Sequence, residues 1–114
     1  MLIASRTLTL RTDQGDKQVP IRIFAPVQHD PKNPRAWSCR FEIDWPDKRK
    51  AMEGSGVDSV QALEMALSLI GTIIYTSSYH QAGDLFWEAP RQGYGFPVPQ
   101  NIRDLLIGDG AKYF

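Results

Sequence analysis

The sequence has little of what small catalytic or secreted domains depend on. One cysteine, Cys39, in 114 residues excludes an internal disulfide framework and a zinc site built from several cysteines. The 13 basic and 13 acidic residues cancel, so no accumulated positive charge supports non-specific binding to nucleic acid or a membrane surface. No segment is long and apolar enough to span a bilayer, and residues 1–10 alternate too early for a secretory signal. We therefore expect a soluble cytoplasmic protein with neither nucleic-acid nor membrane partners.

One long helix is predicted over residues 58–76, within a single domain that takes in residues 1–114. Asp58 is a suitable N-cap, and Gln61 can reach back toward it in a capping box. Apolar side chains cover about twice the width of an ordinary helical stripe, with Gly71 and Tyr75 on the remaining polar arc. A helix this apolar must be covered on two sides, by a sheet and by a second layer.

Alternating patterns before this helix predict an antiparallel meander of three to four strands. The expected strands cover residues 2–11, 19–27 and 36–45, with a weaker fourth over residues 49–55. Leu2, Ala4, Leu8 and Leu10 share the inward face of the first strand. Arg6 falls on that same face, so we expect it near an end of the sheet or with its charged end reaching past the apolar surface. Cys39 falls on the inward face of the third strand, where burial raises the pKa of a thiol and makes it unreactive.

Aromatic residues gather among glycines and prolines over residues 77–99, where the helical period is lost. We expect an ordered segment that packs on the helix, because disordered tails are poor in aromatics. A short second helix is predicted near residues 101–108, with Asn101 as its cap and Gly108 as its stop. The predicted fold is therefore α+β: a three- to four-stranded antiparallel meander on one long helix, an aromatic C-terminal wrap and a short second helix.

Residues 79–96 hold the best candidates for a ligand site. A pocket there would use His80, Trp87, Glu88, Arg91 and Tyr94. His80, Asp84 and Glu88, spaced by four, could hold a divalent cation if the long helix continued that far. Gly83 and Pro90 bracket the segment, however, and favour a solvated loop. No nucleophile with its base, no metal set and no cofactor motif can be assembled, so we predict no catalytic residue, metal or cofactor.

Four stretches together carry a resemblance to a known family: residues 22–28 (Arg-Ile-Phe-Ala-Pro-Val-Gln), 37–46 (Trp-Ser-Cys-Arg-Phe-Glu-Ile-Asp-Trp-Pro), 56–63 (Gly-Val-Asp-Ser-Val-Gln-Ala-Leu) and 93–99 (Gly-Tyr-Gly-Phe-Pro-Val-Pro). In them the chain resembles a family of short bacterial proteins known only as a domain of unknown function. That resemblance covers nearly the whole chain and implies no activity or site. The junction at residues 56–63 is also similar to the antitoxin half of HicAB-type toxin–antitoxin pairs, or HicB-type antitoxins, whose usual DNA-binding segment is not evident here.

Two classes of function remain open from the sequence. The leading interpretation is a non-enzymatic interaction module that engages another protein and exists as a monomer or weak homodimer. It is favoured because no catalytic set can be assembled. The alternative is a small-ligand-binding protein, or an enzyme, with a pocket in the aromatic segment over residues 79–96.

Overall fold

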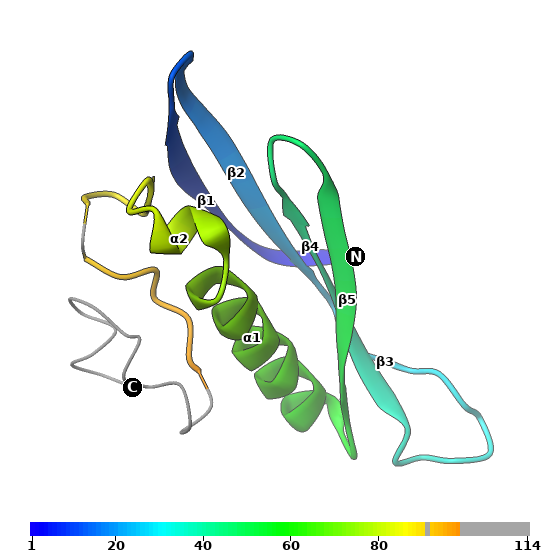
Figure 1. Ribbon diagram of the computed structural model, residues 1–114. Coiled ribbons are helices and arrows are strands. Elements are labelled where there is room, and N and C mark those ends of the chain that lie inside the picture. Colours follow the sequence, from blue (N-terminus) through cyan, green and yellow to red (C-terminus); the bar gives the residue numbers. More distant parts are fainter. Residues whose placement is uncertain (91, 99–114) are drawn as a thin grey trace.

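The computed structural model describes residues 1–90 and 92–98, which form an antiparallel sheet, one main helix and one short helix (Figure 1). The strands are β1 Leu2–Thr12, β2 Gly15–Phe24, β3 Val27–Gln28, β4 Trp37–Asp44, β5 Arg49–Gly56 and β6 Leu85–Phe86, and the helices are α1 Ser59–Tyr75 and α2 Ser78–Gln81. The predicted α+β class is confirmed. The helix predicted near residues 101–108 lies outside the described residues.

The sheet has six strands in the described part of the chain, where the sequence predicted three or four. Its order is β3-β4-β2-β1-β6, with β5 on β4, and every pairing is antiparallel. β2 and β3 both pair with β4 and are separated by Ala25 and Pro26, where the chain leaves the ladder. A proline lacks the N–H that a ladder needs, so the predicted second strand is divided in two. Strand β6, which spans two residues and lies beside β1, was not predicted from the sequence.

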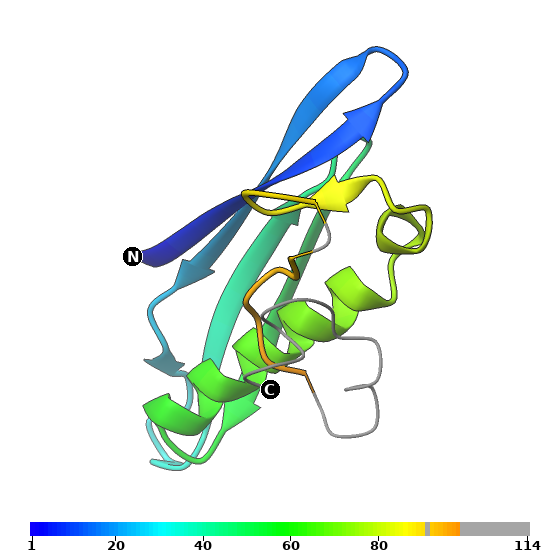
Figure 2. The same ribbon diagram turned by 90° about the vertical axis from the view of Figure 1, so that its left-hand side faces the viewer.

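Helix α1 lies across β4 and β5 (Figures 1 and 2), and two glycines of β5 set how closely it approaches. A Cβ atom at Gly54 would lie 2.3 Å from the backbone nitrogen of Ala66, and one at Gly56 would lie 2.4 Å from that of Ala62. The predicted cap is present, since the Asp58 carboxylate accepts a hydrogen bond from the backbone N–H of Gln61 at 2.8 Å. Within the described residues, no helix is both long and apolar enough to cross a membrane.

The face that α1 buries differs in part from the predicted one. Val60 and Met65 were placed on the apolar side but are 62% and 45% exposed, whereas Gly71 and Tyr75 were placed on the polar arc but are buried. Two neighbours cause this rotation. One side of the helix packs closely on the β5 glycines, and residues 97–98 lie against Gly71 on another side.

The core forms between the sheet, α1 and residues 85–98. Leu8 and Leu10 of β1 are buried in it as predicted, but Leu2 and Ala4 are exposed. The pairing of β1 with β2 shifts register between Leu2 and Ala4, which breaks the predicted alternation at Leu2. Ala4 stays on the face of Arg6 and Leu8 but borders an open cavity, so it is exposed. Cys39 is fully buried, as predicted, and burial raises the pKa of its thiol.

Candidate functional site

Arg6 is the charged group around which the candidate site is built. Strand alternation places it on the inner face of β1, on the same side as the buried Leu8. Its Nη1 donates a hydrogen bond to the Tyr94 carbonyl at 2.9 Å. Its guanidinium carbon lies 3.9 Å from the centre of the Trp87 ring and 5.1 Å from that of Phe96. The cation thus lies over the Trp87 ring and within about 6 Å of the Phe96 centre, the distance over which cation–π attraction acts.

The backbone at Glu88 and at Gly95 brings the chain close to this guanidinium. Glu88 has a φ of 61°, unusual for a residue with a side chain, and the chain turns tightly there as the Ala89 N–H donates to the Trp87 carbonyl at 2.6 Å. At Gly95 a Cβ atom would lie 2.5 Å from Arg6 Nη1 and 3.1 Å from the Trp87 ring. Gly95 also has a φ of 77°, which glycine adopts without strain. Both features bring the chain close to Arg6.

A cavity of about 350 Å³ opens beside Arg6. It lies between β1, β2, α1 and the segment after Tyr94, and it is lined by Ala4, Ser5, Arg6, Ile23, Leu67, Gly95, Phe96 and Pro97. Arg6 supplies the charged side chain of this lining, Ser5 borders it from a position whose side chain alternates to the opposite face of β1, and the other side chains are apolar. An apolar cavity with few polar groups is the usual character of a small-molecule site, and its volume lies near the lower end of the range of about 300–1,000 Å³ for such sites.

The charge of Arg6 is only partly compensated. Burial lowers the pKa of the Arg6 guanidinium, and the more distant Glu88 carboxylate offsets part of this effect. The ion pairs found among the described residues do not include Arg6. A guanidinium has five N–H donors, and one of them is directed at the Tyr94 carbonyl. The cavity therefore borders a cation that an anionic group could approach.

His80 and Tyr94 form a second cluster behind this segment. The Tyr94 hydroxyl donates to the Leu85 carbonyl at 3.3 Å and lies 2.7 Å from Nδ1 of His80, to which it is hydrogen-bonded. Tyr75 meets both rings edge-on, with centroids 5.0 Å away in each case. Burial lowers the pKa of His80 and, as the largest effect, raises the pKa of Tyr94. This cluster anchors residues 92–96 to the end of α1.

The five residues predicted from the sequence are thus distributed over two clusters. Trp87 stacks on Arg6, and Glu88 acts on it electrostatically, while His80 and Tyr94 pair with each other and Tyr94 also contributes its carbonyl to Arg6. Arg91 lies outside the described residues. No three His, Cys, Asp or Glu side chains of residues 1–90 and 92–98 gather closely enough to hold a metal ion. Arg6 itself was missed as a site residue, although a charge on the apolar face of β1 was the signal that could have identified it.

A second cavity, of about 450 Å³, lies where α1 meets α2 and has a different character. Trp45 and Tyr79 stack there with centroids 4.6 Å apart, and the Tyr79 hydroxyl donates to the Asp47 carboxylate at 2.7 Å. Exposed Lys48 and Lys50 complete the rim. Its aromatic and acidic groups already satisfy one another, so it presents a weaker binding site than the Arg6 cavity.

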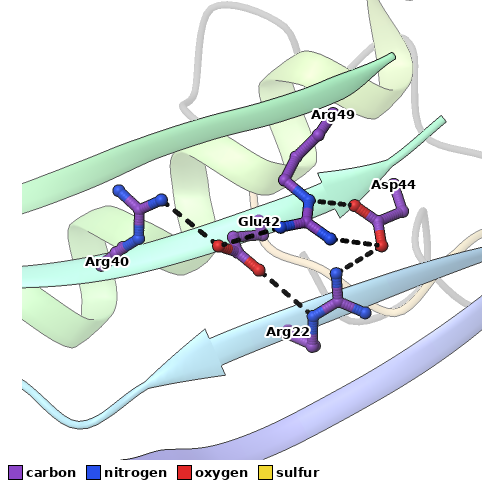
Figure 3. Close-up of polar contacts among 5 residues, drawn as sticks. All are labelled: Arg22, Arg40, Glu42, Asp44 and Arg49. Atoms are coloured by element: carbon purple, nitrogen blue, oxygen red, sulfur yellow. Dashed lines mark hydrogen bonds and ion pairs between the residues drawn. The ribbon is translucent and has the colours of Figure 1, made fainter. Parts of the chain in front are cut away.

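Charged side chains on the outer face of the sheet form a closed network (Figure 3). Arg22 contacts both Glu42, at 3.2 Å, and Asp44, while Arg49 binds Asp44 at 2.6 Å and Arg40 binds Glu42 at 3.2 Å. Hydrogen bonds from Arg49 and Arg22 lower the pKa of Asp44. The contacts of Arg22 and Arg49 cross between neighbouring strands, whereas Arg40 and Glu42 lie on the same strand, β4. Both carboxylates are engaged by arginines, so the network stabilises the pairing of β2, β4 and β5 and leaves no carboxylate poised for acid–base chemistry.

Comparison with known proteins assigns the chain to a family. No curated protein and no solved structure matches it. A family model described as a domain of unknown function (DUF6968) matches residues 4–98, which include most of β1 and the residues that line the Arg6 cavity. The likeness to HicB-type antitoxins has no support from these comparisons. The chain therefore belongs to the family of the domain of unknown function DUF6968.

Proposed function

We propose that the protein binds a small monocarboxylate with an apolar body in the cavity beside Arg6, and that it does so without catalysing a reaction. The observation that carries this proposal is a partly buried guanidinium, stacked on Trp87, at the edge of an otherwise apolar cavity. A carboxylate accepts two parallel hydrogen bonds from a guanidinium, and such charge-assisted bonds are among the strongest in proteins.

The charge and shape of the cavity favour this class of ligand over others. A single guanidinium that is partly balanced by Glu88 suits one negative charge better than a doubly charged phosphate. The remaining walls, formed by Ile23, Leu67, Phe96 and Pro97, offer apolar surface to the rest of the ligand. Burial of that surface contributes roughly 25 cal/mol per Å². Ser5 is the one hydroxyl residue of the cavity lining, its side chain alternates to the opposite face of β1, and the lining contains no histidine, which supports binding over nucleophilic catalysis.

Octanoate is a suitable probe, with octanol and octylamine as controls of the same chain length. We expect octanoate to raise the melting temperature and octanol to do so far less, because only the carboxylate engages Arg6. A ligand present at one hundred times its Kd stabilises the native state by about 2.7 kcal/mol. Hexanoate and 3-phenylpropanoate extend the test to a shorter and to an aromatic body.

Arg6→Met and Arg11→Met form a matched pair of variants for calorimetric titration. Both remove an arginine from β1, but Arg11 is exposed, lies over Phe86 and does not line the cavity. Arg6→Met should weaken octanoate binding by about 10- to 100-fold, since a hydrogen bond to a charged group contributes about 1.5–3 kcal/mol. Arg11→Met should leave it unchanged. Equal binding by the two variants, or no binding of any of the three carboxylates to the wild type, refutes the proposal.

A protein-binding role, the leading interpretation from the sequence, is supported by a different feature. That feature is the outer edge of β1, which carries backbone hydrogen-bonding groups and does not compete with a ligand for the cavity.

A further inference from the structure

The open edges of the sheet differ in how they are protected against pairing with another strand. On its β4 side, β2 is paired over residues 21–23, and its unpaired part contains Pro20, which lacks a donor. The outer edge of β5 carries the charged side chains of Arg49, Lys50 and Glu53, all exposed. Proline and charge are the usual protection of edge strands. Within residues 1–90 and 92–98, β1 is paired on its outer side from Thr9 to Arg11, by β6 at Thr9 and Leu10 and by the Asp84 carbonyl at Arg11, and is unpaired there before Thr9.

The stretch of β1 before Thr9 lacks both kinds of protection. It contains no proline, and its one charge, Arg6, is turned onto the inner face against Trp87 and Tyr94. Leu2 and Ile3 are 50% and 44% exposed, so apolar side chains also lie at this end of the strand. Figure 2 shows β1 at the margin of the sheet, with β6 beside only its far half. An exposed apolar edge of this kind is a template for strand addition.

The direction of each backbone group along this edge follows from the hydrogen bonds that are made. The Arg11 N–H donates to the Asp84 carbonyl at 2.8 Å, on the side away from β2. Alternate residues of a strand direct their N–H and C=O groups to the same side. The backbone groups of Thr9, Thr7 and Ser5 therefore also point away from β2. The register with β2 is regular from Ala4 to Thr12, so the alternation holds throughout this stretch. The backbone groups of Ser5 and Thr7 are thus directed at whatever strand lies next to β1.

We propose that this edge binds the same edge of a second copy of the chain, antiparallel and about a two-fold axis at Ser5. An axis at Arg6 would place two guanidiniums opposite each other, which is destabilising. An axis at Ala4 would place the register shift in the middle of the pairing, and an axis at Thr7 would require Thr9, which β6 already occupies. An axis at Ser5 pairs Ser5 with the partner's Ser5, Thr7 with the partner's Ile3 and Arg6 with the partner's Ala4.

A second copy suits this edge better than a charged partner strand does. The formal net charge is zero, so two copies meet without overall repulsion. A two-fold pairing also occupies the unprotected edge of both chains at once. The β2 and β5 edges carry proline or charge, which disfavours growth of the assembly beyond the dimer through them. This inference is independent of the proposed ligand, because it concerns the backbone edge and not the cavity.

Engineered cysteines test the position of the axis. Paired residues in an antiparallel ladder have Cα atoms about 4.5–5.5 Å apart, within reach of a disulfide. Two copies of Thr7 would lie about 14 Å apart, four residues along a strand. Under a mild oxidant Ser5→Cys should therefore form a covalent dimer on a non-reducing gel, while Thr7→Cys should not. The native Cys39 is fully buried and gives little background. Equal cross-linking of the two variants, or none in either, overturns the proposed register.

Analytical ultracentrifugation over a range of concentrations tests the dimer itself. Ser5→Pro removes the outward N–H and leaves the pairing with β2, whereas Ser5→Ala alters only an exposed side chain. We expect Ser5→Ala to dimerise like the wild type and Ser5→Pro to dimerise at least tenfold more weakly. If Ser5→Pro fails to fold, hydrogen exchange of the wild type replaces it. In that case protection of the Ser5 and Thr7 amides should rise with protein concentration. A wild type that stays monomeric throughout refutes the proposal.

Discussion

The structure and the sequence pattern predict opposite effects of Gly71→Ala on the stability of the protein. The helical pattern places Gly71 on the polar arc of α1, where alanine is more favourable than glycine by about 0.8–1.0 kcal/mol. In the structure Gly71 is buried, and a Cβ atom there would lie 2.1 Å from the Pro97 carbonyl oxygen and 2.9 Å from Val98 Cγ1. A sequence-based expectation is therefore a gain in stability, and the structure predicts a loss.

The size of the loss follows from two opposing contributions. Overpacking a close contact costs about 1–3 kcal/mol, and the upper part of this range applies because the Pro97 oxygen belongs to the backbone and cannot rotate away. The helix propensity of alanine offsets about 1 kcal/mol of it. We expect Gly71→Ala to lower the free energy of unfolding by about 1–2 kcal/mol. The change should also loosen residues 94–98, including the contact of Tyr94 with Tyr75.

Urea denaturation followed by tryptophan fluorescence measures this difference, with Glu64→Ala and Glu64→Gly as controls. Glu64 is exposed in the interior of the same helix, so the difference between its two variants gives the alanine preference of this helix without a steric contribution. If Gly71→Ala stabilises the protein by that same amount, residues 97–98 do not lie against α1. The prediction that the C-terminal segment covers the second side of the helix would then be wrong.

Three further predictions concern the core and the His80 cluster. Gly54→Ala should destabilise the protein by about 2–3 kcal/mol, because its Cβ would lie 2.3 Å from the Ala66 backbone nitrogen. In the same urea titration, Ser55→Ala on the exposed side of β5 should change stability by less than about 0.5 kcal/mol. Burial lowers the folded-state pKa of His80 below its value of 6.5, so its contribution to stability is complete above that pH and is lost as the pH falls through the folded pKa. Thermal unfolding across this window should be less pH-dependent in His80→Gln, and an unchanged slope would contradict the assignment. Cys39 should react with a thiol reagent slowly in the native protein and fast in denaturant, since it is buried and burial raises its pKa.

Local rules were sufficient for most elements before residue 77. Alternation identified β1, β2 and β4, and capping chemistry located the start of α1 at Asp58, while β5, which is exposed along most of its length, was predicted only as a weaker fourth strand. These features depend on neighbours in sequence. The ion pair of Arg22 with Glu42 was also predictable, since opposite charges on adjacent strands of an antiparallel sheet can fall opposite one another.

What the sequence could not predict depends on contacts between distant segments. The rotation of α1 is set by the β5 glycines and by Pro97, which are up to about 40 residues apart along the chain, so no periodicity within the helix reports it. Strand β6 has two residues, too few for any alternation to appear. The cavity requires β1, β2, α1 and residues 95–97 to converge on Arg6. From the sequence, Arg6 was visible only as a misplaced charge on an apolar face.

The position of Arg6 connects the two proposals, because the cavity and the free edge share residues 4–6 of β1. In a dimer with its axis at Ser5, the partner's Arg6 lies opposite Ala4, which lines the cavity. A second guanidinium near the cavity should strengthen the binding of a carboxylate. By thermodynamic reciprocity the ligand must then strengthen the dimer by the same factor. We therefore expect octanoate to lower the dimer dissociation constant of the wild type in sedimentation equilibrium, and to have no such effect on Arg6→Met. If octanoate binds but leaves the dissociation constant unchanged, the partner's Arg6 does not reach the cavity, and an axis away from Ser5 is required.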